Sequence, residues 1–118
     1  MTIYQEVILD HAGHPRNVGS ISNASKTVLV HNPLCGDKIE MDILFEKDKV
    51  VDIKFLAKGC AISKAASSLL TQQAIGKSKL ELKKLTKKDM IKLLKIDLGP
   101  NRIKCALLPL EALQKLLI

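Results

Sequence analysis

Two neighbouring segments in the middle of the chain alternate between apolar and polar residues. Residues 38–46 and 51–58 each place an apolar side chain at every second position. This is the period of a β-strand that buries one face and exposes the other. The polar stretch Lys47-Asp48-Lys49 between them is short enough to join the two strands as a hairpin. The pair therefore predicts an antiparallel sheet at the centre of the fold.

The flanking segments predict a third strand and several helices. We expect a first helix from Thr2 to about Asp10, a strand over 26–31, a helix over 63–75 closed by Gly76, short helices begun by the capping boxes of Ser78 with Glu81 and of Thr86 with Asp89, a turn at Gly99-Pro100-Asn101, and a terminal helix over 111–118 with Pro109 in its first turn. This order predicts a single α+β domain over residues 1–118. Its core would be a three-stranded antiparallel meander with helices packed on one face.

The meander has a consequence for the three cysteines, which are far apart in the sequence. In such a sheet, the connection after the first strand and the exit of the third strand lie at the same end. Cys35 is in that connection, two residues before Asp37, and Cys60 follows the third strand. A helical return can deliver Cys105 to the same place. The topology thus predicts that distant cysteines meet at one end of the sheet.

Three thiolates and a carboxylate would complete a four-ligand site for zinc or an iron–sulfur cluster. Cys60 precedes a predicted helix and Cys105 lies near the start of another, and a helix N-terminus favours thiolate over thiol. Asp37 is a harder ligand than a thiolate, which suggests a site that releases what it holds. However, free cysteines are often buried simply as small hydrophobic residues, and an aspartate after a glycine is common in turns. The residue pattern alone leaves both interpretations open.

The three histidines are weaker candidates for the site. A lone histidine is more often a surface or hydrogen-bonded residue than a ligand, so His11 and His14 are left out. His31, close to Cys35 in sequence, is kept only as an accessory candidate.

Composition restricts the compartment and the partners. No apolar run approaches the length of a membrane span, and no secretion signal is visible. An odd number of cysteines then indicates a reducing compartment, so we expect a cytoplasmic protein. The net charge is +7, and residues 77–95 hold eight lysines against two acidic residues. With only two arginines and three aromatic residues in the chain, we expect a solvated lysine face or a docking surface for an acidic protein, and no nucleic acid.

The segments around these residues resemble a known family, the U-type iron–sulfur cluster assembly scaffolds, which comprise IscU, SufU and the N-terminal domain of NifU. The similar segments run in the family's order over almost the whole chain. They are Tyr4 to His11, Pro15-Arg16-Asn17, Asn32-Pro33-Leu34-Cys35-Gly36-Asp37, Gly59-Cys60-Ala61-Ile62-Ser63 and Arg102-Ile103-Lys104-Cys105. The resemblance implies the fold shared by IscU and SufE.

The resemblance also implies a function and a ligand set. Cys35, Cys60 and Cys105 would be thiolate ligands of a transient [2Fe–2S] cluster, and Asp37 its labile fourth ligand. Zn²⁺ would be the alternative occupant of this iron-binding site. Sulfur would arrive as a persulfide from a cysteine desulfurase, with Cys35 and Cys105 as candidate acceptors. The product would pass to cluster carriers or SUF-type assembly proteins.

Two departures from the family pattern concern the subtype. Lys104 stands where IscU-type members have a histidine, and residues 99–103 replace their Pro-Pro-Val-Lys chaperone-recognition segment. Both features are SufU-like and argue against dependence on a dedicated Hsp70-type chaperone. The spacing between Cys60 and Cys105, however, leaves no room for the insertion typical of SufU.

We therefore expect a non-enzymatic scaffold. The alternative is a zinc-dependent sulfurtransferase, a SufU-like persulfide relay that stimulates a cysteine desulfurase. A third and less favoured hypothesis is a zinc-stabilised interaction module that binds nucleic acid through Lys77 to Lys95, a stretch that lacks the arginine and aromatic residues used for base recognition.

Overall fold

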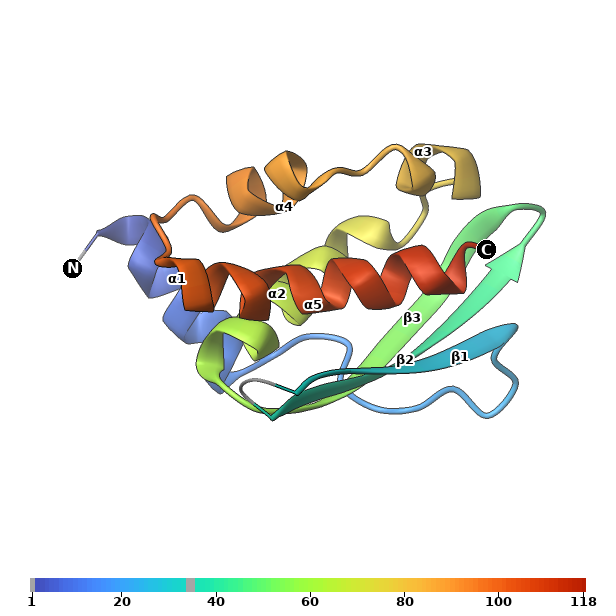
Figure 1. Ribbon diagram of the computed structural model, residues 1–118. Coiled ribbons are helices and arrows are strands. Elements are labelled where there is room, and N and C mark those ends of the chain that lie inside the picture. The colour runs from blue at the N-terminus through green and yellow to red at the C-terminus, as the bar shows by residue number, and fades with distance from the viewer. Residues whose placement is uncertain (1, 34–35) are drawn as a thin grey trace.

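The computed structural model, which describes residues 2–33 and 36–118, confirms the three-stranded antiparallel sheet with helices packed on one face (Figure 1). The strands lie in the order β1-β2-β3, as a meander requires. In chain order the elements are α1 (Ile3–Gly13), β1 (Lys26–Asn32), β2 (Asp37–Glu46), β3 (Lys49–Lys58), α2 (Ala61–Ala74), α3 (Lys79–Lys83), α4 (Lys87–Leu94) and α5 (Pro100–Leu116). None of these helices combines the length and the apolar character that crossing a bilayer requires.

The hairpin between β2 and β3 is tighter than predicted, because Lys49 already belongs to β3. Only Lys47 and Asp48 form the turn, and both have positive φ angles, 52° and 66°. Two-residue turns of this kind match the right-handed twist of the strands that they join.

A β-bulge in this hairpin overturns one detail of the predicted alternation. The register shifts between Leu44, which pairs with Asp52, and Phe45, which pairs with Val50. Val51 lies at the shift, so the period of two slips by one residue. Val50 is consequently only 1% exposed, whereas Val51, which the alternation placed on the buried face, is 44% exposed.

The core lies between the sheet and the two long helices, α2 and α5. The sheet contributes large side chains, among them the fully buried Ile39, Met41 and Ile43 of β2. Helix α2 contributes small ones, such as Ala65 and Ala66, which let the helix approach the sheet closely. Burial of each large side chain contributes about 1.5–3 kcal/mol, so this layer is the main source of stability.

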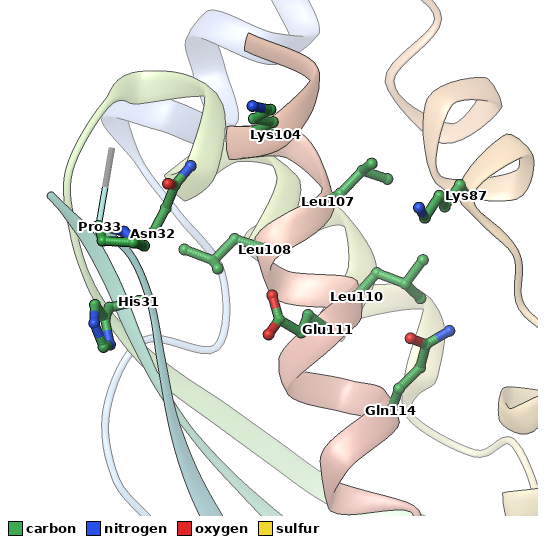
Figure 2. A pocket seen from close by; sticks show the side chains of 10 residues that line it. All are labelled: His31, Asn32, Pro33, Lys87, Lys104, Leu107, Leu108, Leu110, Glu111 and Gln114. Atoms are coloured by element: carbon green, nitrogen blue, oxygen red, sulfur yellow. The ribbon is translucent and has the colours of Figure 1, made fainter. Parts of the chain in front are cut away.

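Helix α5 differs most from the prediction. It begins at Pro100, not near Glu111, and runs for 17 residues between β1 and α4 (Figure 2). Pro100 occupies the first turn, where its fixed φ suits a helix start, so the expected turn at 99–101 is the helix N-terminus. Pro109 lies inside the helix, where it cannot donate a backbone hydrogen bond, but it is buried with its leucine neighbours against the core.

The other helices follow their predicted caps, with small differences in length. All three capping boxes are present, at Thr2, Ser78 and Thr86. Helix α1 continues past Asp10 to Gly13, and α2 begins two residues before Ser63. Gly76 follows the end of α2 with a φ of 86°, as expected of a glycine after a helix.

A buried polar cluster fixes α1 and the following loop to α2. The Ser68 hydroxyl lies 2.7 Å from Nδ1 of His11 and accepts a hydrogen bond from the backbone N–H of Arg16 at 2.8 Å. Nearby, the Asn17 amide donates to the hydroxyl of Thr71 at 3.2 Å. Burial, with the Arg16 charge as a smaller contribution, holds the pKa of His11 below its usual value.

This cluster predicts a loss of stability in mild acid. Because the folded state lowers the pKa of His11, the unfolded chain binds more protons as the pH falls below about 6.5, and the free energy of unfolding decreases. The His11→Asn variant keeps a hydrogen-bonding group near Ser68 but does not titrate. Urea unfolding of metal-free, reduced protein at pH 7.5 and 5.5 should show a smaller pH dependence for the variant. An equal dependence would assign the acid sensitivity to other groups.

Candidate metal centre

The register of the sheet places Asp37 beside the exit of β3. Lys38 pairs with Lys58, so Asp37 at the start of β2 lies next to the residues that follow β3. Those residues are Gly59 and Cys60, and Cys60 is the N-cap of α2. Its backbone N–H donates to Oδ1 of Asp37 at 3.1 Å. The predicted meeting of the first connection with the end of the third strand is thus present at Asp37 and Cys60.

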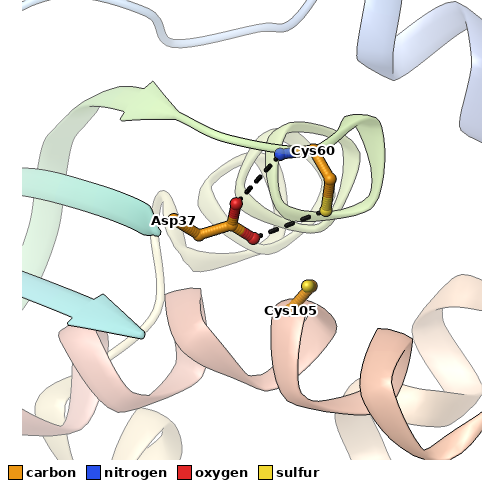
Figure 3. A group of neighbouring side chains, drawn as sticks. All are labelled: Asp37, Cys60 and Cys105. Atoms are coloured by element: carbon orange, nitrogen blue, oxygen red, sulfur yellow. Dashed lines mark hydrogen bonds between the residues drawn. The ribbon is translucent and has the colours of Figure 1, made fainter. Parts of the chain in front are cut away.

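Cys105 reaches the same place from α5, as Figure 3 shows. The ligand atoms of Asp37, Cys60 and Cys105 all lie within 4.8 Å of one another. Sγ of Cys60 is 3.4 Å from Oδ2 of Asp37. Sulfur ligands of a tetrahedral zinc lie about 3.8 Å apart, given Zn–S bonds of about 2.3 Å. Two thiols and a carboxylate in this arrangement could therefore hold a metal ion after small adjustments.

The other predicted site residues have different outcomes. Cys35 lies outside the described residues, so its place in the group stays a prediction. His31 is exposed, and the group found among the described residues does not include it. His11 is buried against Ser68, which agrees with its exclusion from the site.

Asp37 is a buried carboxylate with several hydrogen-bond donors around it. It is 2% exposed, and its Oδ2 accepts a hydrogen bond of 2.6 Å from the hydroxyl of Ser63. Burial alone would raise the pKa of Asp37, but the hydrogen bonds from Ser63, Cys105 and Cys60 outweigh it and lower the pKa. The carboxylate is therefore ionised at neutral pH, as a metal ligand must be.

The two described thiols differ in access to solvent. Cys60 is exposed and Cys105 is buried, with 6% of its surface accessible. Cys105 lies near the start of α5, as predicted, but in its second turn, and the dipole at a helix N-terminus acts mainly over the first turn. A hollow of about 680 Å³ opens beside both cysteines, with apolar walls from α1 and α2 that include Ile8, Leu9 and Ile62.

The sequence analysis missed the role of Ser63. Its side chain is fully buried, donates to Asp37, and lies 3.4 Å from Sγ of Cys60. The available signal was its position in the first turn of a helix, three residues after a candidate ligand at the N-cap, where the two side chains share a face.

Gly59 permits the approach of Asp37 to the start of α2. A Cβ built at Gly59 would overlap the carboxylate of Asp37, and its φ of 144° is one that residues other than glycine rarely adopt. The space for the carboxylate therefore exists because residue 59 is a glycine, which has no side chain.

Substitution of this glycine should disrupt the group of ligands. In Gly59→Ala the new methyl group displaces the Asp37 carboxylate, and backbone strain alone costs about 1–3 kcal/mol. We expect weaker zinc binding in a competition titration with a chromogenic chelator, together with a lower midpoint of urea unfolding. The matched control is Gly13→Ala, where a Cβ meets nothing within 4 Å and φ is not positive. Zinc binding by Gly59→Ala equal to that of the control would exclude this role of Gly59.

Comparison with known proteins places these residues in a family context. The chain matches the family described as NifU-like N terminal domain over residues 3–117. The zinc-dependent sulfurtransferase SufU of Bacillus subtilis is 39% identical over 132 residues, covering 97% of this chain and 88% of that protein. The scaffold protein IscU 1 of Archaeoglobus fulgidus, named for iron–sulfur cluster assembly, is 34% identical over 116 residues, covering 98% of this chain and 75% of the relative.

A solved structure gives the same result for the fold. The SufU protein of Fervidobacterium islandicum AW-1, a proposed iron–sulfur cluster assembly scaffold for the SUF system, superimposes with a TM-score of 0.82 at 34% identity. The match covers 96% of this chain and 95% of that structure. The alignment with the Bacillus protein is longer than the 118 residues of this chain, so that relative carries additional residues.

Proposed function

Since the chain belongs to the family of NifU-like N-terminal domains, whose members act in iron–sulfur cluster assembly, we propose that it is a scaffold on which a [2Fe–2S] cluster is assembled and from which it is released. The observation that carries the proposal is the convergence of Asp37, Cys60 and Cys105, with ligand atoms within 4.8 Å of one another. Cys35 would supply the fourth ligand.

This combination of thiolate and carboxylate ligands suits a cluster that must be released. Thiolates bind iron and zinc strongly, whereas a carboxylate is a harder and more easily replaced ligand. Asp37 already has other partners, since Ser63 and the backbone N–H of Cys60 donate to its two oxygens. When Asp37 leaves the metal, these hydrogen bonds stabilise the free carboxylate. Dissociation of this one ligand thus has a lower cost than dissociation of a thiolate.

Sulfur delivery would use a persulfide of a cysteine desulfurase. A thiolate of this chain attacks the terminal sulfur of that persulfide, a new S–S bond forms, and the desulfurase cysteine leaves as a thiolate. Cys35 and Cys105 remain the proposed acceptors, although the exposure of Cys60 makes it the more accessible of the two described thiols. Conversion of the transferred sulfur to sulfide takes two further electrons, which an external electron donor must supply.

A second candidate function is a zinc-dependent sulfurtransferase, favoured by the similarity to the Bacillus SufU protein and by Lys104. Asp37, Cys60 and Cys105, with Cys35, would then hold zinc as a resident ion. Zinc would keep the cysteines deprotonated, and a cysteine of the chain would carry the persulfide.

Anaerobic purification distinguishes the two functions. The protein, produced without overproduction of other assembly proteins, should contain iron and acid-labile sulfide in equal amounts if it is a scaffold. Near-stoichiometric zinc without sulfide, together with a large zinc-dependent stimulation of a cysteine desulfurase and no cluster formed, would reject the scaffold in favour of the relay. Metal analysis and a steady-state desulfurase assay provide these measurements.

Ligand variants should separate retention from release. Cys60→Ser and Cys105→Ser replace a strong ligand by a weak one, so we expect loss of the bound metal. If a cluster forms, Asp37→Ala should slow its transfer to an apoprotein, because the exchangeable ligand is gone. This variant also removes the partner of Ser63, which costs about 1–3 kcal/mol of stability. If release from Asp37→Ala is unchanged, Asp37 is not the labile ligand. If the serine variants retain metal normally, the proposed ligand set is wrong.

A further inference from the structure

A second hollow, of about 540 Å³, runs along α5 between the end of β1 and the start of α4 (Figure 2). Its apolar side is formed by Leu107, Leu108 and Leu110 of α5. Its polar rim includes His31 from β1, Lys87 from α4 and Lys104 from α5. We call this hollow the α5 groove.

The α5 groove carries uncompensated positive charge. Lys87 and Lys104 are exposed, and neither takes part in an ion pair among residues 2–33 and 36–118. The acidic residue of the groove, Glu111, lies 3.5 Å from Lys115, one helical turn along α5. Its charge is therefore offset within the helix.

The neighbouring helices do not neutralise this charge either. The acidic residues of α3 and α4, Glu81 and Asp89, accept hydrogen bonds from Ser78 and Thr86 in the two capping boxes. These bonds hold the pKa of each carboxyl below its usual value and direct it to a helix N-terminus. The lysines at the start of α4 thus add to the positive charge beside the α5 groove.

We propose that the α5 groove binds an acidic segment of a partner protein, with an apolar side chain against the leucines and carboxylates beside Lys87 and Lys104. Charge complementarity identifies the occupant, because an apolar strip between unpaired lysines fits a segment that combines apolar and acidic residues. The choice of a protein rests on the proposed function, since a chain that exchanges sulfur or a cluster must hold a second protein near its cysteines. Nucleic acid fits less well, because the lining residues include no arginine and no Phe, Tyr or Trp ring for base stacking.

The α5 groove ends beside the candidate metal centre. Lys104 directly precedes Cys105 on α5, and Asn32 at the end of β1 pairs with Asp37 at the start of β2. A segment bound along α5 would therefore place its own protein next to the ligands. The hollow at Cys60 stays open on the side of α1 and α2.

The test uses a fluorescein-labelled peptide of twelve residues that combines glutamate with leucine at every third or fourth position. Binding to the purified chain is followed by fluorescence anisotropy, and the site is mapped by amide chemical shifts. Lys87→Glu and Lys104→Glu should each weaken binding about tenfold, the effect of losing one well-placed charge pair. Both positions are exposed, and glutamate at the first residue of α4 suits the helix N-terminus.

The matched control is Lys88→Glu, which makes the same charge change at the next residue of α4, outside the groove lining. We expect the affinity of this variant for the peptide to fall by less than threefold. A peptide of glutamate alone should bind more weakly than the leucine-containing peptide, and a lysine–leucine peptide should not bind. An equal loss in Lys88→Glu would indicate diffuse charge attraction and overturn the proposal. Chemical-shift changes confined to Leu9 and Ile62 would place the peptide in the hollow at Cys60 and would also overturn the proposal. The same holds if single-stranded RNA or anionic vesicles bind as tightly as the peptide.

Peptide binding is measured on metal-free protein, and metal content on separate samples. If the chain retains metal normally but does not bind the peptide, the proposed role of the α5 groove is wrong and the proposed function is unaffected. Peptide binding without metal retention in the native chain would overturn the proposed function alone.

Discussion

The hydrogen bonds between Asp37 and the start of α2 are the contact on which the site depends. They join the beginning of β2 to the residues after β3, and they place a carboxylate, a thiol and a helix N-terminus within a few ångströms of one another. The antiparallel register brings the segments together, and Gly59 leaves the space for the carboxylate. The rest of the fold supports this junction, because α5 can supply Cys105 only while it packs on β1 and β2.

The environment of Asp37 balances two opposing requirements. A buried carboxylate without partners would be protonated and would not bind a metal ion. The donors around Asp37, with Ser63 at 2.6 Å, keep it charged while they also compete with a metal for its oxygens. Such a ligand is available at neutral pH and weak by comparison with thiolate. In the proposed function, Ser63 would therefore influence metal exchange through Asp37, in addition to its part in the buried structure of α2.

The positions of the charged residues in α3 and α4 follow from the capping of these helices and from the cost of burying charge. The two acidic residues among the lysines of α3 and α4 stabilise helix N-termini, which leaves those lysines without ion-pair partners inside the helices. Burial of so much positive charge would be costly, so the lysines of α3 and α4 remain accessible to solvent. The candidate metal centre thus lies beside exposed lysines, of which Lys104 directly precedes Cys105.

The sequence alone determined the elements whose signals are local. The alternation in residues 38–46 and 51–58 specified the hairpin, and the capping boxes at Thr2, Ser78 and Thr86 specified three helix starts, because a strand period or a cap depends on residues a few positions apart. The meander topology followed from these elements, and with it the prediction that the connection after β1 meets the end of β3; the structure shows this meeting at Asp37 and Cys60. The residue pattern left open whether the three cysteines and Asp37 form a ligand site, and the resemblance to a known family favoured that interpretation.

Only the tertiary structure decided the features that depend on packing between distant segments. The bulge at Val51 follows from the pairing of two strands, and Pro109 is accepted inside α5 because that helix is buried on the sheet. The contact of Ser63 with Asp37 joins residues 26 positions apart, and the α5 groove needs β1 and α4 on either side of α5. Sequence periodicity carries no information on such contacts, since they are set by how the elements pack and not by the order of residues within one element.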